Sequence, residues 1–150
     1  YGISALMTIG EGLGEADAKV HASPAVTEAL LVHGAAFRDF PGMSILADKE
    51  KAMAASPLGH VDGKEPPFFL WHGSNDKLVS PMQSAHMFEA LKKAGVDVRY
   101  RLVEGAGHGD LVWYQEPVIR EVTTWFAEKL GPVTPMEKSA ENAADKAGTL

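Results

Sequence analysis

The sequence predicts an α/β fold in which parallel strands alternate with flanking helices. A continuous apolar run at residues 68–71 is followed by a helical pattern at 81–94, and an alternating apolar-polar stretch at 96–102 comes next. A second helical pattern covers residues 117–130. Because strand, helix, strand and helix in this order form right-handed crossover units, the strands are expected to run parallel in one sheet.

The two strands differ in how their apolar residues are spaced. Phe68-Phe-Leu-Trp71 lies between Pro66-Pro67 and His72-Gly73, and a short run without alternation is typical of a strand that is buried on both faces. In residues 96–102, valine, tyrosine and leucine alternate with aspartate and arginine. This period of two indicates a half-exposed strand near an edge of the sheet.

The helix between the strands has a strong start signal. Ser80 can cap its first turn, Pro81 suits the first helical position, and the Gln83 side chain can complete a capping box. The last helix is expected to start near Pro117 and to stop before Gly131-Pro132.

The N-terminal third carries weaker signals. The apolar residues 3–9 are expected to form a helix, and residues 11–23, which mix glycine, aspartate and lysine, are expected to form a loop. Residues 26–32 fit a buried strand, with helix as the alternative because they include good helix formers. Residues 44–55 are expected to be helical up to Ser56-Pro57.

A chain of 150 residues is long enough for one domain with a buried core, which we expect at residues 1–130. Residues 131–150 are rich in alanine, lysine, glutamate and asparagine, and we expect a flexible polar tail there. About three strands are expected in all. Three parallel strands leave one inner edge and much apolar surface bare, so more sheet should come from further sequence or a partner chain.

Charge and composition exclude several classes of function. The 14 basic and 20 acidic residues give a net charge of −6, which argues against nucleic acid or an anionic membrane surface as a partner. The chain has no cysteine, so it cannot form a disulfide or use a thiolate as nucleophile or zinc ligand. The longest apolar runs are far shorter than the ~20 residues of a membrane span.

The candidate chemistry lies just past the two expected strands. Asp76 follows the first and His108, in Gly105-Ala-Gly-His108-Gly, follows the second. Functional groups gather at the carboxyl ends of parallel strands, and an acid that orients a general-base histidine needs this kind of convergence. Taken singly, Asp76 is equally compatible with ordinary turn chemistry, and His108 with an exposed loop histidine.

Other residues are weaker candidates. Trp113 could contact a substrate, but packing of Trp113 and Tyr114 under the histidine loop, with Asp110 as its cap, is the alternative. A metal site at His108 and Asp110 would need a second histidine at a spacing that such sites favour, and none is found. We therefore expect neither a metal nor a cofactor. His72 is expected to be a hydrogen-bonded core histidine.

Two stretches carry a resemblance to a known family. Pro66–Val79, with His72-Gly-Ser-Asn-Asp76, and Gly105-Ala-Gly-His108-Gly-Asp110, with the closing helix that ends in Trp125-Phe126, resemble the α/β-hydrolase superfamily. The resemblance is to its esterases of the carboxylesterase and feruloyl-esterase-like group, and it extends over residues 1–130. It implies the C-terminal part of an α/β-hydrolase fold, with Asp76 as the triad acid and His108 as the general base.

The same resemblance implies a nucleophilic serine in a Gly-x-Ser-x-Gly elbow, and the sequence contains no such motif. Ser4 is the nearest serine, but Gly2-Ile-Ser4-Ala-Leu6 lacks the second glycine and is expected to be helical. The serine is therefore expected upstream of Tyr1, in an N-terminal portion of the same enzyme or in a separate chain.

The predicted function is a serine esterase that cleaves small carboxylic esters. A peptidase or lactonase of the same fold is one alternative. A non-catalytic α/β module that binds a ligand or a partner is the other.

Overall fold

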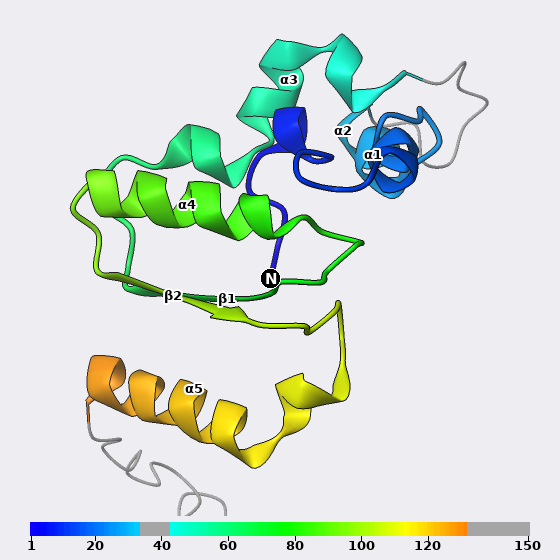
Figure 1. The fold of residues 1–150 in the computed structure, drawn as a ribbon. Coiled ribbons are helices and arrows are strands. Elements are labelled where there is room, and N and C mark those ends of the chain that lie inside the picture. The colour runs from blue at the N-terminus through cyan, green and yellow to red at the C-terminus, as the bar shows by residue number, and fades with distance from the viewer. Residues whose placement is uncertain (34–42, 132–150) are drawn as a thin grey trace, which may run out of the picture.

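The computed structural model describes residues 1–33 and 43–131 of the chain. Its centre is a two-stranded parallel sheet with α4 on one face and α5 on the other, while α1, α2 and α3 form a separate group (Figure 1). The elements in chain order are η1 (Leu6–Thr8), α1 (Glu15–His21), α2 (Thr27–His33), η2 (Ile45–Ala47), α3 (Lys49–Ala54), η3 (Pro57–His60), β1 (Phe68–Gly73), α4 (Pro81–Lys93), β2 (Val98–Val103), η4 (Leu111–Tyr114) and α5 (Glu116–Leu130).

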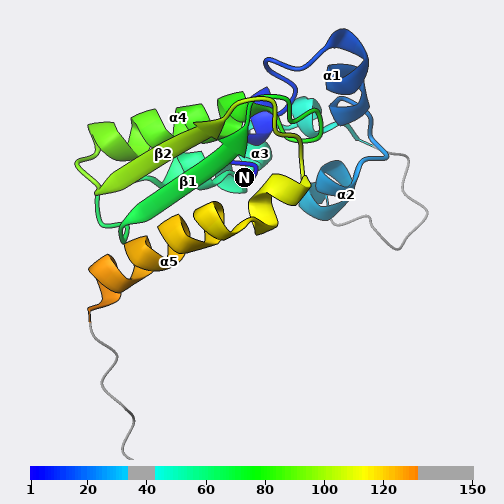
Figure 2. The same cartoon turned by 60° about the horizontal axis from the view of Figure 1, so that its bottom comes forward.

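The sheet confirms the parallel arrangement expected from the sequence. β1 pairs with β2 in parallel, from Phe68 opposite Val98 to Gly73 opposite Val103, and α4 connects the two strands. Both strands therefore end at the same edge of the sheet, where the loops after β1 and β2 begin. In Figure 2 the carboxyl ends of the strands point toward α1 and α2, which lie beyond this edge.

The main core lies between α4 and the sheet. Its buried residues are Met87, Leu91 and Val96, and side chains of β1 and β2 pack against them. Leu91 is fully buried, and burial of such a side chain contributes about 2 kcal/mol. The helical pattern expected at residues 81–94 is thus present as α4, whose buried face covers the sheet.

The opposite face of the sheet is covered by α5 through aromatic and charged side chains. Trp125 is buried, and its ring centroid lies 5.7 Å from that of Phe69 in β1. Ion pairs from β2 to α5 add to this contact, Arg99 with Glu128 at 3.0 Å and Arg101 with Glu121 at 2.6 Å. The partial burial of the first four β1 residues fits this open packing and differs from the full burial expected for that strand.

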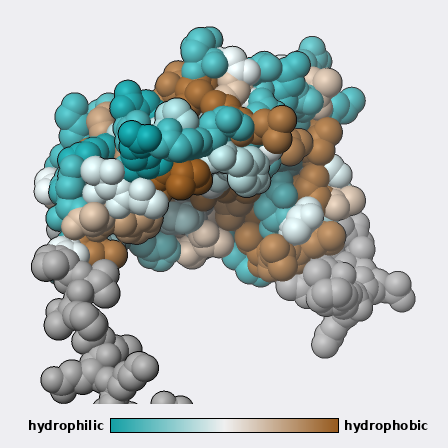
Figure 3. Space-filling model, turned by 90° about the horizontal axis from the view of Figure 1, so that it is seen from below, coloured by the Kyte–Doolittle hydropathy of each residue, from teal (hydrophilic) through white to brown (hydrophobic). Residues whose placement is uncertain are grey.

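The solvent-facing side of α5 exposes hydrophobic side chains. Ile119 and Phe126 of α5 are about half exposed, and Leu130 is largely exposed. Figure 3, which views the molecule from the α5 side, shows brown hydrophobic areas among teal hydrophilic ones. Among the described residues no helix combines the length and the apolar character that crossing a bilayer requires.

A second core joins the N-terminal segment to α2, η2 and α3. It consists of small and branched side chains that are almost fully buried, namely Leu6, Ile9, Ala29, Ile45 and Ala52. The helix expected at residues 44–55 is present as η2 followed by α3, with Asp48 as the N-cap that accepts from the Lys51 N–H.

The prediction of a helix at residues 3–9 is wrong. Residues 1–5 are not helical, Ala5 is extended, and only η1 is helical in this stretch. The cause is tertiary: the N–H groups of Ser4 and Ala5 donate to Oε1 of Gln83, at 3.0 and 2.8 Å. For the same reason Gln83 does not complete the predicted capping box of α4, although Ser80 accepts from the Met82 N–H as expected.

Two further expectations for the N-terminal third are corrected. Residues 11–23 contain α1, in which Glu15 and Asp17 lie in the first turn and Lys19 in the last. This charge order stabilises a helix through its dipole and outweighs the neighbouring glycines. Most of the stretch at residues 26–32 takes the helical alternative, since α2 begins at Thr27, so the described residues form two strands and not about three. Of the tail expected at residues 131–150, all but the first residue lies outside the described residues.

Candidate active site

The loop after β1 buries the carboxylate of Asp76. The side chain is completely shielded from solvent, and its Oδ1 accepts from the N–H groups of Leu78 and Val79, both at 2.9 Å. An aspartate that bonds to its own turn two and three residues ahead closes that turn, so the turn chemistry considered for Asp76 is present. The second carboxylate oxygen, Oδ2, remains available for another partner.

The loop after β2 approaches the Asp76 loop closely. The Asn75 N–H donates to the carbonyl oxygen of Ala106 at 2.9 Å, and the Gly105 N–H donates to Oγ of Ser74 at 2.8 Å. A Cβ atom on Gly73 would collide with the backbone of Ala106. Glycine at position 73 is therefore what allows the two loops to touch.

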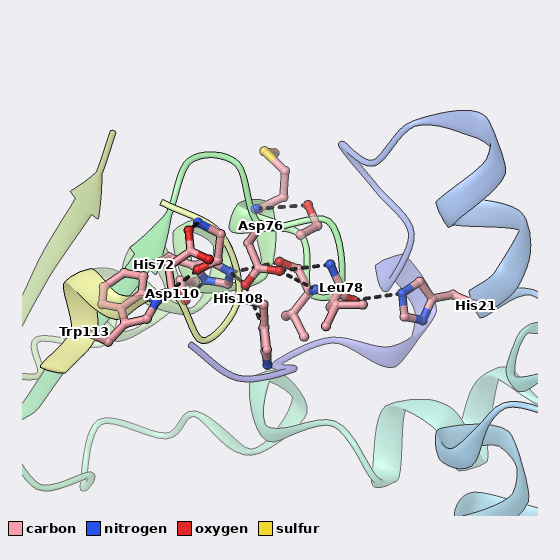
Figure 4. A network of polar contacts seen from close by, with 12 residues as sticks. His21, His72, Asp76, Leu78, His108, Asp110 and Trp113 are labelled. Atoms are coloured by element: carbon pink, nitrogen blue, oxygen red, sulfur yellow. Dashed lines mark hydrogen bonds and ion pairs between the residues drawn. The ribbon is translucent and has the colours of Figure 1, made fainter. Parts of the chain in front are cut away.

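This contact brings Asp76 and His108 together, 32 residues apart in the sequence (Figure 4). Oδ2 of Asp76 lies 2.8 Å from Nδ1 of His108, whose side chain is 31% exposed. Because a carboxylate can only accept, Nδ1 carries the proton and donates. In the neutral imidazole this leaves Nε2 with a free lone pair, which is the state a general base needs.

The environment of Asp76 keeps the carboxylate ionised. Burial raises its pKa, but the hydrogen bonds from Val79, His108 and Leu78 together lower the pKa further than burial raises it, so the net pKa is below the usual aspartate range. An acceptor that stays charged holds the His108 tautomer at neutral pH.

Behind Asp76 lies His72, the expected core histidine, and this expectation is confirmed. His72 is fully buried at the end of β1, with Nδ1 2.7 Å from Oγ of Ser84 and Nε2 2.9 Å from the carbonyl oxygen of Val79. Burial lowers its pKa, so the ring is neutral. Its Nε2 also lies 3.3 Å from Oδ2 of Asp76, a proximity that was not anticipated from the sequence.

The network continues to α1 through a residue that the sequence analysis missed. His21 lies 2.6 Å from Oε1 of Glu28 through Nδ1 and 3.0 Å from the carbonyl oxygen of Leu78 through Nε2. Since residues 11–23 were expected to form a loop, no local signal placed His21 beside the Asp76 turn. These contacts fasten α1 and α2 to the loop that holds the acid (Figure 4).

Trp113 lies under the His108 loop. It is 9% exposed, and its indole N–H donates to the carbonyl oxygen of Gly107 at 2.9 Å. Asp110 accepts from the Gly107 N–H at 2.5 Å. This geometry agrees with the packing alternative for Trp113 and Asp110, whereas Tyr114 is exposed and does not share that role. Contact of Trp113 with a substrate stays a prediction.

The N-terminal residues also reach the site. The Tyr1 ring lies 4.4 Å from that of His108 and 5.4 Å from that of Trp113, between centroids. Ser4, by contrast, is buried, and its Oγ donates to the backbone oxygen of Gln83 at 2.6 Å. Within residues 1–33 and 43–131, no group of three potential metal ligands is found.

The chain is similar in sequence to a family of known proteins. The sequence pattern of the prolyl oligopeptidase family matches residues 18–133. The esterase LipQ of Mycobacterium tuberculosis is 41% identical over 56 residues, which are 37% of this chain and 13% of that protein. A probable isoprenylcysteine alpha-carbonyl methylesterase of Arabidopsis thaliana is 31% identical over 94 residues, 57% of this chain and 20% of that protein.

Solved structures give matches of similar extent. In the structure of Thermogutta terrifontis esterase 2 phosphoramylated by tabun, the matched part is 30% identical, covers 60% of this chain and 35% of that chain, and has a TM-score of 0.48. The chain thus spans 20% or less of the two curated relatives and about a third of this solved chain.

Proposed function

The chain belongs to the prolyl oligopeptidase family, with an α/β-hydrolase fold, and from this premise we propose that it supplies the acid and the base of a serine hydrolase. The proposed substrates are small carboxylic esters. The observation that carries the proposal is the hydrogen bond of 2.8 Å between Oδ2 of the buried Asp76 and Nδ1 of the partly exposed His108.

Each member of the pair has a defined role in this reaction. Nε2 of His108 takes the proton of the serine hydroxyl as Oγ attacks the ester carbonyl carbon. The same nitrogen then gives the proton to the leaving alcohol, and in the second half-reaction it activates the water that releases the acid. Asp76 holds the imidazole in the Nδ1–H tautomer and stabilises the imidazolium that forms.

The nucleophile is proposed to lie in a segment that precedes Tyr1 in a longer polypeptide or in a partner chain. The position of the Tyr1 ring against the His108 ring supports this. Because consecutive Cα atoms are about 3.8 Å apart, a residue that directly precedes Tyr1 would also lie near His108. Ser4 is unsuitable because its hydroxyl is buried and already donates to Gln83.

A peptidase is the second candidate, and the description of the family favours it. Two of the curated relatives are named as esterases, and these names favour ester cleavage. The acid and base serve both reactions, since each passes through a tetrahedral intermediate and needs a proton for its leaving group. Turnover of matched ester and amide substrates with one acyl group separates them.

The proposal is tested by labelling the full-length protein with an alkyl fluorophosphonate, which reacts with activated serines. Mass spectrometry is expected to find one modified serine in a segment N-terminal to Tyr1, and the labelling rate is expected to fall about 10³-fold in His108→Ala. The matched control is His60→Ala, an exposed histidine that is hydrogen-bonded to the carbonyl oxygen of Ala54, which should label at the normal rate. Absence of labelling, or labelling that does not depend on His108, would favour the non-catalytic module.

A further inference from the structure

We propose that His72 is a positioning residue for the reaction, which holds the Asp76 turn so that Oδ2 stays aimed at His108. The proposal rests on the function proposed above and adds a residue to it. The polar partners of His72 are Ser84, Val79 and Asp76, so its proposed effect on the reaction passes through Asp76.

The hydrogen bonds around His72 fix which ring nitrogen carries the proton. The carbonyl oxygen of Val79 can only accept, so Nε2 carries the hydrogen and donates to it at 2.9 Å. Nδ1 is then unprotonated and accepts from the hydroxyl of Ser84 at 2.7 Å. The ring is completely buried, which leaves no water to exchange for either partner.

This arrangement makes Val79 a link between His72 and Asp76. The Val79 carbonyl accepts from His72, and the Val79 N–H donates to Oδ1 of Asp76 at 2.9 Å. One end of the turn is thereby tied to β1 through the imidazole, while its other end is already part of the chain leaving β1. With both ends tied, the carboxylate has little freedom to rotate away from His108.

The Nε2–H group of His72 also lies close to the second carboxylate oxygen of Asp76, Oδ2. Nε2 of His72 lies 3.3 Å from Oδ2, the atom that accepts from His108 at 2.8 Å. A neutral ring with its N–H on this side presents the positive end of a dipole to Oδ2. His72 therefore attracts Oδ2 and helps to hold the carboxylate in its orientation, and it does so without taking the proton of His108.

If His72 had a purely structural role, its important contact would be the one that Nδ1 makes with Ser84. His72 and Ser84 form a buried pair that joins β1 to α4, and loss of either partner would weaken that joint. The two roles differ in which nitrogen matters, since Nδ1 serves the joint with α4 and Nε2 serves the Asp76 turn. Variants that remove one side at a time separate them.

The test compares His72→Asn, His72→Gln and Ser84→Ala in the full-length protein, with an activated aryl ester as substrate. The asparagine amide reaches the Nδ1 position but not the Nε2 position, so kcat is expected to fall about 10²-fold while KM changes by less than about threefold. The longer glutamine amide restores a donor toward Val79 and is expected to recover most of kcat. Ser84→Ala is expected to lower the melting temperature and to leave kcat near normal.

Several outcomes would overturn the inference. A folded His72→Asn protein with normal kcat would do so, as would a loss of kcat in Ser84→Ala or His72→Gln as large as that in His72→Asn. If His72→Asn does not fold, His72→Thr, which also lacks a donor at the Nε2 position, takes its place with the same expected loss of kcat. If His108→Ala turns over ester at the wild-type rate, the proposed function is overturned, and this inference with it. If turnover depends on His108 but is unchanged in the His72 variants, only the inference is overturned.

Discussion

Gly73 and Ala106 meet backbone to backbone, and this contact joins the loop that carries Asp76 to the loop that carries His108. Gly73 is the last residue of β1, and a Cβ atom there would collide with the carbonyl group of Ala106. The same carbonyl accepts from the Asn75 N–H at 2.9 Å. The separation of the two loops, and with it the hydrogen bond between Asp76 and His108, depends on the absence of a side chain at position 73.

Gly73→Ala is therefore expected to force the loops apart. Because the obstacle is backbone and not the end of a flexible side chain, the cost is expected to be about 2 kcal/mol of unfolding free energy. A displacement of about 1 Å between Asp76 and His108 should also lower kcat about 10²-fold. Urea unfolding and ester turnover of the same preparation measure both effects.

The control for this variant is Gly14→Ala. Gly14, the N-cap of α1, has φ −61° and only one side-chain atom near the added Cβ, at 3.9 Å, so the substitution should leave turnover unchanged and lower the unfolding free energy by no more than about 1 kcal/mol. Normal turnover in Gly73→Ala would show that the loop contact does not set the geometry of the pair.

Gln83→Ala is expected to destabilise the fold strongly. The Gln83 side chain is fully buried, accepts from the Ser4 and Ala5 N–H groups and donates to the carbonyl oxygen of Thr8 at 2.9 Å. Removing it leaves these backbone groups unpaired, at a cost of about 3 kcal/mol. Glu89→Ala, at an exposed position of the same helix, should change the unfolding free energy by less than about 0.5 kcal/mol in the same denaturant titration. Equal stability of the two variants would contradict the role given to Gln83.

The burial of His72 predicts a pH dependence of stability. Its pKa in the folded protein is lowered by burial, while in the unfolded chain the pKa is near its usual value of about 6.5. As pH falls below about 6.5, the unfolded state binds a proton that the folded state does not, so the unfolding free energy decreases by up to about 1.4 kcal/mol per pH unit until the folded pKa is reached.

His72→Gln removes this group and should flatten the dependence. Urea titrations at several pH values between about 5 and 7.5 measure the slope for both proteins. A slope that is the same in His72→Gln and in the wild type would mean that the folded protein protonates His72 as readily as the unfolded chain does.

The 150-residue chain alone is expected to be inactive toward esters. Among the described residues no serine hydroxyl is hydrogen-bonded to His108: Ser4, for example, donates to Gln83, and Ser84 is bonded to His72. An acid and a histidine without a nucleophile have nothing to activate. Turnover of an aryl ester above the buffer rate that disappears in Ser4→Ala would show that the nucleophile has been misplaced.

The elements that could be predicted from the sequence are those with a strong local pattern. The apolar run of β1, the start signal of α4 and the alternation of β2 lie within short windows, and the crossover rule then brings the ends of β1 and β2 to one edge. That is why Asp76 and His108 could be placed together from their positions after the two strands.

The parts that were missed depend on contacts between distant residues. The non-helical backbone at Ser4 and Ala5 follows from bonds to Gln83, 79 and 78 residues away. The contact of His21 with the Leu78 carbonyl spans 57 residues. Periodicity within a short window contains no information about such bonds, and tertiary hydrogen bonds override local propensity where the two disagree.

The central claim is that Asp76 and His108 form the acid–base pair of a serine hydrolase, and kcat of the full-length protein tests it most directly. His108→Ala is expected to lower kcat about 10³-fold or more, and Asp76→Asn, which keeps an acceptor for the turn, by about the same factor or somewhat less. His60→Ala should keep kcat, and the melting temperature of His108→Ala should stay within about 3 °C, because a partly exposed loop side chain carries little of the core. A folded His108→Ala protein that turns over ester at the normal rate would contradict the claim.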